Sequence, residues 1–379
     1  MRPRPFAGLS KWQLARRIVA PALFVGALFV SVFTYEPPPP PTLEELALDE
    51  VTLSGDALGT TWNARVVGTA PDPAGQQEMA AAVSSALDEV DALMSTWRDD
   101  SELSAFNRHA TSEPFTVSPP TLAVLVRAET VWRESGGAFD VTVYPLVRAW
   151  GFGGAELDQA PADDALAAIL ERVGQQHLTL DQVNQTVTKD RPDVTVDLSA
   201  IAKGYAVDRV SRALSNLGYK HHMVEVGGEV RARGWNRYKR PWRIAVERPD
   251  TTARTVETVV QLTGLSMATS GDYRNFREKD GRRWSHTIDP RSGQARLHAL
   301  ASATVLHAEC ALADAYATTF MVLGPEAAMD LATRLDIAAL FLVRDADGGF
   351  EHRPSPAFER HQQSARDIPG EPDASRSAG

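Results

Sequence analysis

The segment ECALADAYATTFMVLG, residues 309–324, combines an apolar helical pattern with two oxygen-bearing side chains. Asp314 and Thr318 are four residues apart, so a helix places them on the same face. A carboxylate and a hydroxyl are hard oxygen ligands of the kind that suit Mg²⁺. The structural alternative is an Asp that pairs with an Arg and a Thr that bonds its own helix backbone.

A second segment, VDLSAIAKGYAVD at 196–208, places polar residues at the start of a predicted helix. Asp197 is predicted to close a strand, and either Asp197 or Ser199 could simply cap the helix that follows. Free N–H groups at a helix start, followed within one turn by Lys203, also form a site for an anion. Both interpretations stay open on these residues alone.

Several loops near these segments are shaped by glycine. Gly136-Gly137 allow a backbone path that a side chain would block, just before Asp140. Gly227-Gly228 interrupt the strand pattern of residues 224–234, which predicts a bulge or a close approach by another group. Residues 269–271, Thr-Ser-Gly, are predicted to form a tight polar turn.

Histidines offer two further candidates. His286 and Asp289 precede a Pro-Arg-Ser-Gly turn in WSHTIDPRSG, and a lone His in such a place is either structural or catalytic. His221-His222 are predicted to be a surface pair. Neighbouring strand residues point to opposite faces, so that pair is a poor bidentate metal site.

The elements that must position these residues are mixed. Hydrophobic periodicity and capping residues predict helices at 76–95, 120–135, 161–173, 201–217 and through 309–324. Strands are predicted at 60–67, 177–180, 186–188, 223–226, 242–246, 255–262 and 301–306. This mixture predicts an α+β fold with a largely antiparallel sheet, and the missing Gly-x-Gly-x-x-Gly unit disfavours a Rossmann fold.

The chain divides into segments of different composition. Arg16-Arg17 precede 18 uncharged residues, 18–35, which are long enough to cross a bilayer as a helix. The positive charges predict that residues 1–17 are cytoplasmic and that the rest lies outside. A cleaved signal peptide is the alternative. Residues 36–50, which include Pro37–Pro41, are predicted to be a stiff linker, 51–353 the folded domain, and 354–379 a disordered tail.

Charge and cysteine content exclude other classes. The formal net charge is −10, which disfavours a general nucleic-acid binder. Cys310 is the single cysteine, so neither an intrachain disulfide nor a multi-cysteine zinc site can form.

Taken together and in this order, the motifs resemble the FAD:protein FMN transferases, the ApbE-type flavin transferases. The matching runs are ALGTTW (57–62), STWRDDSELSAFN (95–107), GGAFDVTVYPLVRAWGFG (136–153), VDLSAIAKGYAVD (196–208), VGGEVRARG (226–234), ATSGDYRNF (268–276), SHTIDPRSG (285–293) and LADAYATTFMVLG (312–324). They span nearly the whole predicted domain. The resemblance implies one α+β, T-fold-like flavin-transferase domain with packed helices, preceded here by one transmembrane helix.

The resemblance also implies roles for single residues. Mg²⁺ is expected to be held by the backbone carbonyl of Ala200 and the side chains of Asp314 and Thr318. His286 and Asp314 are the expected catalytic residues, with Asp289 as another candidate base. The residues expected to contact FAD are Leu58, Trp97, Ala138, Phe139, Asp140, Asp197, Lys203 and Ile288.

The implied reaction is Mg²⁺-dependent transfer of FMN from FAD to a Thr or Ser hydroxyl of a target protein, with release of AMP. The expected acceptor is a membrane redox protein, and the catalytic domain is expected on the periplasmic side of a bacterial inner membrane. Alternatives are a Mg²⁺-dependent FAD pyrophosphatase or a flavin-binding assembly factor without catalysis.

The sequence departs from the family pattern in three places. Trp97 stands where Tyr is common, Lys203 stands where relatives can have another polar residue, and no cysteine for lipid attachment follows the apolar segment.

Overall fold

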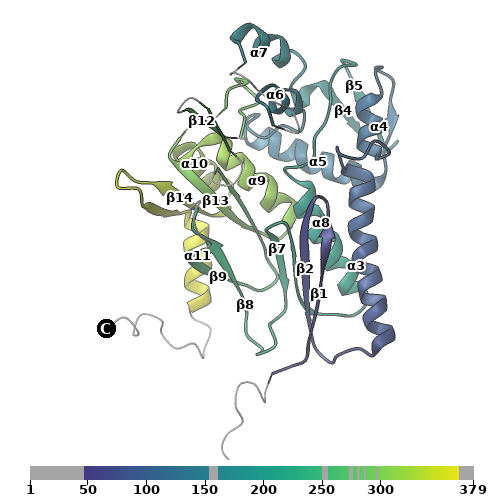
Figure 1. Ribbon diagram of the computed structural model, residues 1–379, viewed down its shortest axis with the longest axis vertical. Coiled ribbons are helices and arrows are strands. Elements are labelled where there is room, and N and C mark those ends of the chain that lie inside the picture. The colour runs from purple at the N-terminus through teal and green to yellow at the C-terminus, as the bar shows by residue number, and fades with distance from the viewer. Residues whose placement is uncertain are drawn as a thin grey trace, which may run out of the picture. The chain divides into compact units, whose positions relative to one another are not determined.

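The structure is a computed structural model, shown in Figure 1, and its core is an eight-stranded sheet. It describes residues 47–152, 161–249, 255–272, 276–279, 282–285, 287–295 and 298–366, with backbone alone for 276–279 and 282–285. The predicted membrane segment 18–35 and His286 lie outside these residues. Within them, no helix combines the length and the apolar character that a membrane crossing requires.

The large sheet has the order β1-β2-β6-β7-β10-β13-β14-β15, and every neighbouring pair is antiparallel. This confirms the predicted α+β class with a largely antiparallel sheet. Its strands are β1 (Glu50–Ala57), β2 (Thr60–Val67), β6 (His221–Val226), β7 (Glu229–Arg233), β10 (Ser266–Gly271), β13 (Leu300–His307), β14 (Ala338–Arg344) and β15 (Phe350–Pro354). The smaller sheets are formed by β3 (Phe115–Thr116), β5 (Thr186–Lys189) and β4 (Leu178–Asp181), by β8 (Trp242–Glu247) and β9 (Val256–Leu262), and by β11 (Phe276–Lys279) and β12 (Arg282–Ser285).

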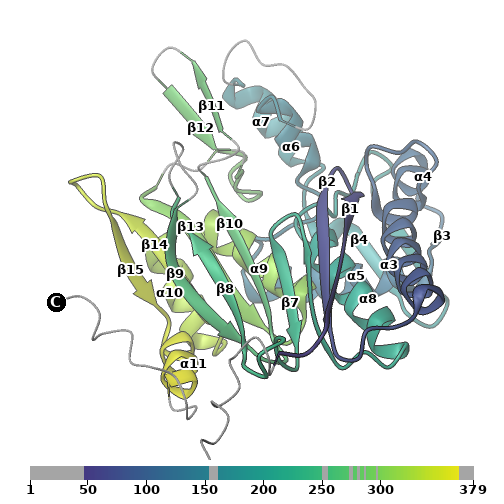
Figure 2. The ribbon, with the colours of Figure 1, turned by 60° about the horizontal axis from the view of Figure 1, so that its bottom comes forward.

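Strand alternation gives the sheet two buried faces. In β14, Phe341 packs in the main core whereas its neighbours Leu340 and Leu342 pack in a second core. The main core lies against helices, and the second is covered by the β8–β9 hairpin and α11 (Pro356–Arg366) (Figure 2). A sheet that is buried on both faces needs apolar residues at successive positions, which explains the run AALFLV of β14.

The remaining helices of the described chain surround the main core and the loops above it. They are α3 (Pro73–Met94), α4 (Glu102–Arg108), α5 (Pro119–Glu134), α6 (Tyr144–Ala149), α7 (Asp163–Leu170), α8 (Ala202–Asn216), α9 (Cys310–Leu323) and α10 (Pro325–Arg334). The sequence predicted α3, α5, α7, α8 and α9, and it missed α4, α6 and α10.

The hairpins define two ends of the sheet. At one end are the β1–β2 turn, where Ala57 pairs with Thr60, and the β6–β7 turn, where Val226 pairs with Glu229. At the other end Val67 pairs with His221, and Arg233 pairs with His222. The chain of α8 runs from the first end towards the second, because β6 follows it after a short turn. The first end, called the hairpin end below, is where the polar motifs meet.

Helices α8 and α9 touch through a glycine. A Cβ added to Gly204 would lie 2.6 Å from the carbonyl carbon of Cys310, closer than such atoms approach in proteins. Only glycine therefore permits this contact without a shift of one helix. The contact fixes the start of α8 beside the start of α9, and with it Lys203 beside Asp314.

Two local predictions were wrong, and of the two alternatives for Gly227-Gly228 only the close approach of another group is realised. Residues 269–271 do not form a turn but continue β10 and pair with β13. The hydroxyl of Thr269 lies 2.9 Å from that of Thr304 on β13, which satisfies this polar side chain within the sheet. Gly227-Gly228 form the β6–β7 hairpin turn, at φ of 61° and 105°, and are not a bulge. His222 is fully buried, since it contacts the hydroxyl of Ser211 at 2.8 Å, and burial lowers its pKa to about 4.

The predicted disordered tail was also wrong for its first part. Residues 356–366 form α11, which Ser355 caps by accepting a hydrogen bond from the N–H of Phe358 at 3.3 Å. Phe358 is fully buried in the second core. The tail is polar in composition, so the sequence analysis overlooked Phe358, the apolar residue that packs α11 against the second core. Residues 367–379 lie outside the described chain.

We predict that Gly204→Ala destabilises the protein by at least about 2 kcal/mol, because the new methyl group forces α8 and α9 apart. In an ordinary helix the same change is stabilising. Urea unfolding followed by circular dichroism measures the effect. Asn216→Ala, at the exposed end of α8, is the matched control and should leave the midpoint within error; equal midpoints for Gly204→Ala and the wild type would contradict the prediction.

Candidate functional site at the hairpin end

Three ionisable side chains from three elements meet at the hairpin end. The ammonium of Lys203, at the start of α8, lies 3.3 Å from Oε1 of Glu229 in β7 and 3.7 Å from Oδ1 of Asp314 in α9. The two carboxyl groups are buried, at 6% and 2% side-chain exposure. The structure therefore brings together the predicted residues Lys203 and Asp314, and it adds Glu229.

The cluster contains two carboxyl groups for one ammonium. Burial opposes charge on Lys203, but the Asp314 and Glu229 carboxylates outweigh it and raise the pKa of Lys203. Burial raises the pKa of Glu229 to about 8, with Asp314 adding to the shift and Lys203 opposing it. Oε2 of Glu229 has no hydrogen-bond partner within the described residues. The folded protein therefore favours the protonated form of Glu229, while Lys203 and Asp314 pair as opposite charges.

The carboxylate of Asp314 also changes the first turn of α8. Its Oδ2 accepts a hydrogen bond from the backbone N–H of Gly204 at 3.0 Å. In a regular helix that N–H would bind the carbonyl of Ala200, four residues earlier. In the described chain the N–H of Ala202 donates to Leu198 and that of Tyr205 to Ile201, but that of Gly204 makes no such bond, so the Ala200 carbonyl is left without this partner.

Thr318 lies one turn after Asp314 on α9 and is half-buried. Its hydroxyl lies 3.3 Å from that of Ser270 in β10. The structural alternative for this helix face is thus partly realised: Asp314 does pair with a cation, Lys203 rather than an Arg, while the Thr318 hydroxyl faces another hydroxyl rather than its own backbone.

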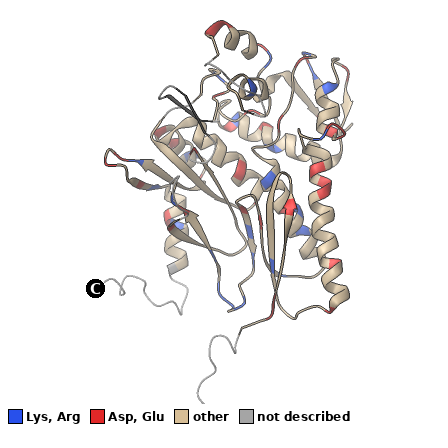
Figure 3. Cartoon of the chain, viewed as in Figure 1, with Lys and Arg blue, Asp and Glu red and all other residues tan. Residues whose placement is uncertain are grey.

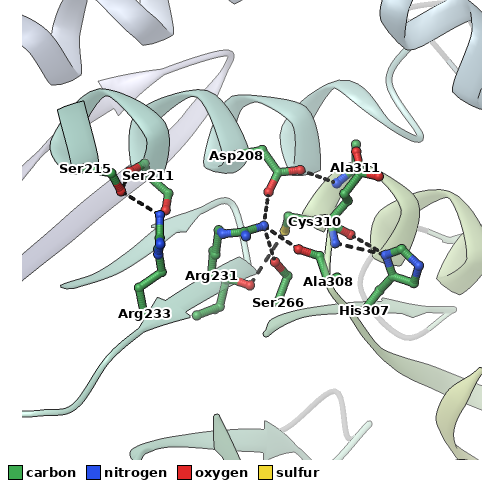
Figure 4. A network of polar contacts seen from close by, with 12 residues as sticks. Asp208, Ser211, Ser215, Arg231, Arg233, Ser266, His307, Ala308, Cys310 and Ala311 are labelled. Atoms are coloured by element: carbon green, nitrogen blue, oxygen red, sulfur yellow. Dashed lines mark hydrogen bonds and ion pairs between the residues drawn. The ribbon is translucent and has the colours of Figure 1, made fainter. Parts of the chain in front are cut away.

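A polar network below the cluster holds the three elements together (Figure 4). Asp208 of α8 accepts from Arg231 of β7 at 2.6 Å and from the backbone N–H of Ala311 in α9 at 3.0 Å. Arg231 also donates to the carbonyl of Ala308 at 2.6 Å. Because one carboxylate and one guanidinium join α8, β7 and α9, the positions of Lys203, Glu229 and Asp314 are fixed relative to one another.

The predicted loop residues Asp140 and Asp197 belong to adjoining segments. The backbone N–H of Asp197 donates to the carbonyl of Val141 at 2.7 Å. Asp140 is buried and accepts from the N–H and hydroxyl of Thr142 and the N–H of Gln175, at 2.6–2.8 Å. Burial raises the pKa of Asp140 and of Asp197, while these hydrogen bonds, and that from Ser199 to Asp197, oppose the shift. The Asp140 carboxylate therefore stabilises the conformation of its own loop and joins that loop to Gln175.

The other predicted FAD contacts differ in exposure. Ala138 and Phe139 are buried, so their backbone is what the loop can offer. Ile288 is 4% exposed and packs in a small cluster with Leu146 and Trp150. Trp97 is 81% exposed, which leaves its ring free to stack on a planar group.

Leu58 lies in the β1–β2 turn, beside the β6–β7 turn that contacts Lys203. It adopts φ of 54° between β1 and β2 and is half-buried. A Cβ on Gly227 would meet Thr60 at 2.9 Å and the side chain of Lys203 at 3.3 Å, so the two hairpin turns and the start of α8 are in close contact.

The turn after His286 approaches the Asp140 loop. Asp289 is buried and accepts from the backbone and the guanidinium of Arg291, each at 2.9 Å. The side chain of Arg291 lies beside Gly137. His286 itself lies outside the described residues.

Comparison with known proteins matches this arrangement to one family. The sequence model of the ApbE family matches residues 58–341, which include every motif described above except one residue of the first. The chain belongs to the ApbE family. It is similar to the "FAD:protein FMN transferase" of Vibrio cholerae, with 43% identity over 83% of this chain and 93% of that protein, and to that of Escherichia coli K12, with 36% identity over 89% and 95%.

Solved ApbE structures have the same fold. The structure titled flavin transferase ApbE from Vibrio cholerae superposes with a TM-score of 0.75 at 42% identity and covers 83% of this chain and 99% of its own. The apo form of Pseudomonas stutzeri flavinyl transferase ApbE gives 0.75 at 35%, covering 83% and 97%. The expected family is therefore confirmed from sequence and from structure.

Sequence reasoning missed two residues of this ApbE-family site. Glu229 follows Gly228 in VGGEV, and the sequence analysis considered only the glycines of this motif. A carboxylate among apolar strand residues is a signal for burial with a partner, and this signal could have identified Glu229. Asn107 ends the second motif; its side chain donates to the carbonyl of Val196 at 2.8 Å and accepts from the N–H of Val196 at 2.7 Å. It holds 194–198 extended without a partner strand, which is why the strand predicted before Asp197 is absent.

A cavity lies elsewhere. A hollow of about 290 Å³ is lined by Asp49, Val66, Pro71 and His221, among others, at the opposite end of the sheet. It includes none of Lys203, Glu229 and Asp314, so the candidate site is defined by its ionisable side chains and not by this cavity. Within the described chain, no group of three or more His, Cys, Asp and Glu side chains is arranged to hold a metal.

We predict that Glu229→Gln removes part of the pH dependence of stability. The folded pKa of about 8 lies above the ordinary 4.5, so between these values the unfolded chain releases a proton that the folded chain keeps. Stability therefore falls as pH rises through this window, by an amount on the order of a few kcal/mol. Urea unfolding at pH 5 and about pH 8 should show a smaller loss in the variant than in the wild type.

Glu225→Gln serves as the control for that experiment, because Glu225 lies half-buried on the same hairpin. Its loss of stability between the two pH values should match that of the wild type. A Glu229→Gln variant that loses as much stability as the wild type would contradict a buried, protonated Glu229.

Proposed function

We propose that this chain transfers FMN from FAD to a Thr or Ser hydroxyl of a target protein and releases AMP. The observation that carries the proposal is the Lys203–Glu229–Asp314 cluster inside a chain that belongs to the ApbE family. The names of the relatives, FAD:protein FMN transferase, support flavin transfer as the activity.

The residues present suit Mg²⁺. Asp314 and Thr318 provide a carboxylate and a hydroxyl on one helix face, and the Ala200 carbonyl lacks its usual helical partner because Gly204 donates to Asp314. The cluster also holds two carboxyl groups beside one ammonium, and a bound cation would favour loss of the proton that Glu229 keeps. These are hard oxygens in a site that can accept positive charge, and we propose that Ala200, Asp314 and Thr318 hold the ion. When bound, Mg²⁺ would neutralise charge on the phosphate oxygens.

The protein's own groups then position the two reactants. Lys203 directs an ammonium group towards the pyrophosphate of FAD, while Glu229 restrains it. Leu58, Trp97 and the loop of Ala138, Phe139 and Asp140 surround the flavin, and Asp197 and Ile288 complete the proposed contacts. Holding the hydroxyl and the phosphorus in line supplies much of the catalysis in phosphoryl transfer.

The transfer forms one bond and breaks another. The oxygen of the acceptor hydroxyl bonds to the phosphorus on the FMN side, and the bond from that phosphorus to the oxygen of AMP breaks. The hydroxyl proton passes to a base. Asp289 is engaged by the Arg291 guanidinium, and Asp314 by Lys203, so we propose His286 as the base and Asp314 as a ligand of the metal ion.

Location is a separate proposal. We propose that residues 18–35 anchor the chain in a bacterial inner membrane and that the domain from 51 onwards lies in the periplasm. The support is the uncharged run after Arg16-Arg17 and the proline-rich linker that follows. The acceptor is then a redox protein with a domain on the same side of that membrane.

We predict that Asp314→Ala lowers flavin transfer at least about a thousand-fold, because it removes a ligand of the proposed ion and the partner of Lys203. The assay mixes the full chain with FAD, Mg²⁺ and an acceptor domain and follows the fluorescent acceptor band on a denaturing gel, with AMP in parallel. Asp330→Ala, exposed on α10, is the control. Normal transfer by Asp314→Ala would reject the metal assignment.

The same assay separates the alternatives. AMP and free FMN without a labelled acceptor favour a pyrophosphatase, which uses water instead of a protein hydroxyl. Tight FAD binding without any AMP favours an assembly factor that binds flavin without turnover.

We predict that His286→Ala slows transfer by about a hundred-fold or more while FAD binding changes little, because a base acts on the acceptor and not on FAD affinity. Equilibrium titration of FAD by flavin fluorescence gives the affinity, and the gel assay gives the rate. An equal loss of affinity and rate would make His286 a substrate contact instead. His352→Ala, on the outer strand β15, is the histidine control.

A further inference from the structure

The loop that joins β7 to β8 has an unusual composition for this acidic chain. Residues 233–243, RGWNRYKRPWR, hold five basic and three aromatic residues and no acidic one, whereas the whole chain has a net charge of −10. Figure 3 shows Lys and Arg in this loop at the lower end of the sheet, opposite the hairpin end. The loop belongs to none of the groups assigned to the transfer reaction.

Hydrogen bonds within the loop hold it in a defined conformation. The N–H of Asn236 donates to the carbonyl of Arg240 at 2.8 Å, and the N–H of Lys239 donates to the carbonyl of Asn236 at 2.9 Å. The Asn236 side chain closes the turn from inside, because its oxygen accepts from the N–H of Tyr238 and its nitrogen donates to the carbonyl of Pro241. The turn therefore presents its remaining side chains outward in a fixed arrangement.

The outward side chains are aromatic and basic. Trp235 is 44% exposed and stacks on His221, with ring centroids 4.3 Å apart, and Tyr238 is 37% exposed. Lys239 and Arg240 are exposed, and the described residues contain no ion pair for either. Trp and Tyr beside Lys and Arg are the residues enriched where proteins meet the headgroups of a bilayer.

The loop also lies where the chain enters the domain. The backbone N–H of Leu48 donates to the carbonyl of Arg237 at 2.8 Å, so the entry of β1 is bonded to the loop itself. Only residues 36–46 separate this entry from the proposed anchor, 18–35. Eleven residues span at most about 40 Å, so the entry of β1, and with it the loop, lies within about that distance of the proposed anchor.

We infer that the 233–243 loop docks the domain onto an anionic bilayer surface, with Trp235 and Tyr238 at the headgroups and Arg233, Lys239 and Arg240 against lipid phosphates. The occupant is a bilayer because the tether limits the distance between this loop and the membrane and because the charges are complementary, while the acidic body of the chain is repelled. The inference rests on the proposed anchor, not on the proposed reaction.

The test uses the full chain in lipid vesicles. Cys310, the only cysteine, is fully buried, so Lys239→Cys permits a nitroxide label at the loop alone. Asp347→Cys, in the β14–β15 turn at the hairpin end, is the control position. Vesicles contain either equal parts of phosphatidylglycerol and phosphatidylcholine or phosphatidylcholine alone. The readout is the accessibility of the label to oxygen, which enters lipid, and to a water-soluble nickel complex.

In anionic vesicles we expect the label at 239 to become accessible to oxygen and shielded from nickel, and the label at 347 to remain exposed to nickel. Adding Arg233→Glu and Arg240→Glu should shift the docked population at least about 25-fold, since each basic residue near such a surface contributes about five-fold. High salt should weaken docking in the same direction.

A label at 239 that stays accessible to nickel in anionic vesicles overturns the inference. Equal shielding in phosphatidylcholine or in detergent overturns it too, because the loop would then contact a protein, such as a second copy. Loss of flavin transfer in detergent by the double Glu variant would assign the loop to an acceptor. If the wild type docks but transfers no flavin, the inference stands and the proposed function fails; if the chain does not float with vesicles in high salt, the anchor fails.

Discussion

The close contact of α8 and α9 at Gly204 is the constraint on which the site depends. Without a side chain at Gly204 the two helix starts approach until its N–H reaches the Asp314 carboxylate. One hydrogen bond thereby orients the acid, interrupts the first turn of α8 and exposes the Ala200 carbonyl. The Asp208–Arg231 network fixes the same helices to β7, and so sets Glu229 opposite Lys203.

The cluster shows how a carboxylate is kept in an apolar helix. The sequence raised the problem of Asp314 among alanines and aromatics, and a metal was the expected answer. The structure adds an earlier step: Lys203 and a backbone N–H already stabilise Asp314 in the protein alone. An ion at this position would meet an ammonium group, and Glu229 is placed to hold that group aside. If the site binds the proposed ion, the two answers would describe the site before and after binding.

Sequence reasoning recovered the features that local patterns encode. Helices α3 and α8 have regular apolar spacing and clear ends, and the motifs gave the family. It failed where distant residues decide. Thr269 was predicted to be a turn residue, but it pairs with β13. Phe358 was predicted to belong to a disordered tail, but it packs in the second core. The role of Glu229 depends on Lys203, which lies beside it only in the folded chain. The partners that decide these cases, Thr304, the leucines of β14 and Lys203, are distant in the sequence, so a local pattern could not identify them.

The length of β2 has a consequence for substrate choice. Its eight residues separate the turn beside Lys203 from the end where the 233–243 loop lies, a rise of roughly 26 Å. If the loop docks on the bilayer, the reactive centre lies at a fixed distance above the lipid surface. An acceptor must then offer its hydroxyl at that height. Selection among membrane proteins would follow from the elevation of the target residue as well as from the sequence around it.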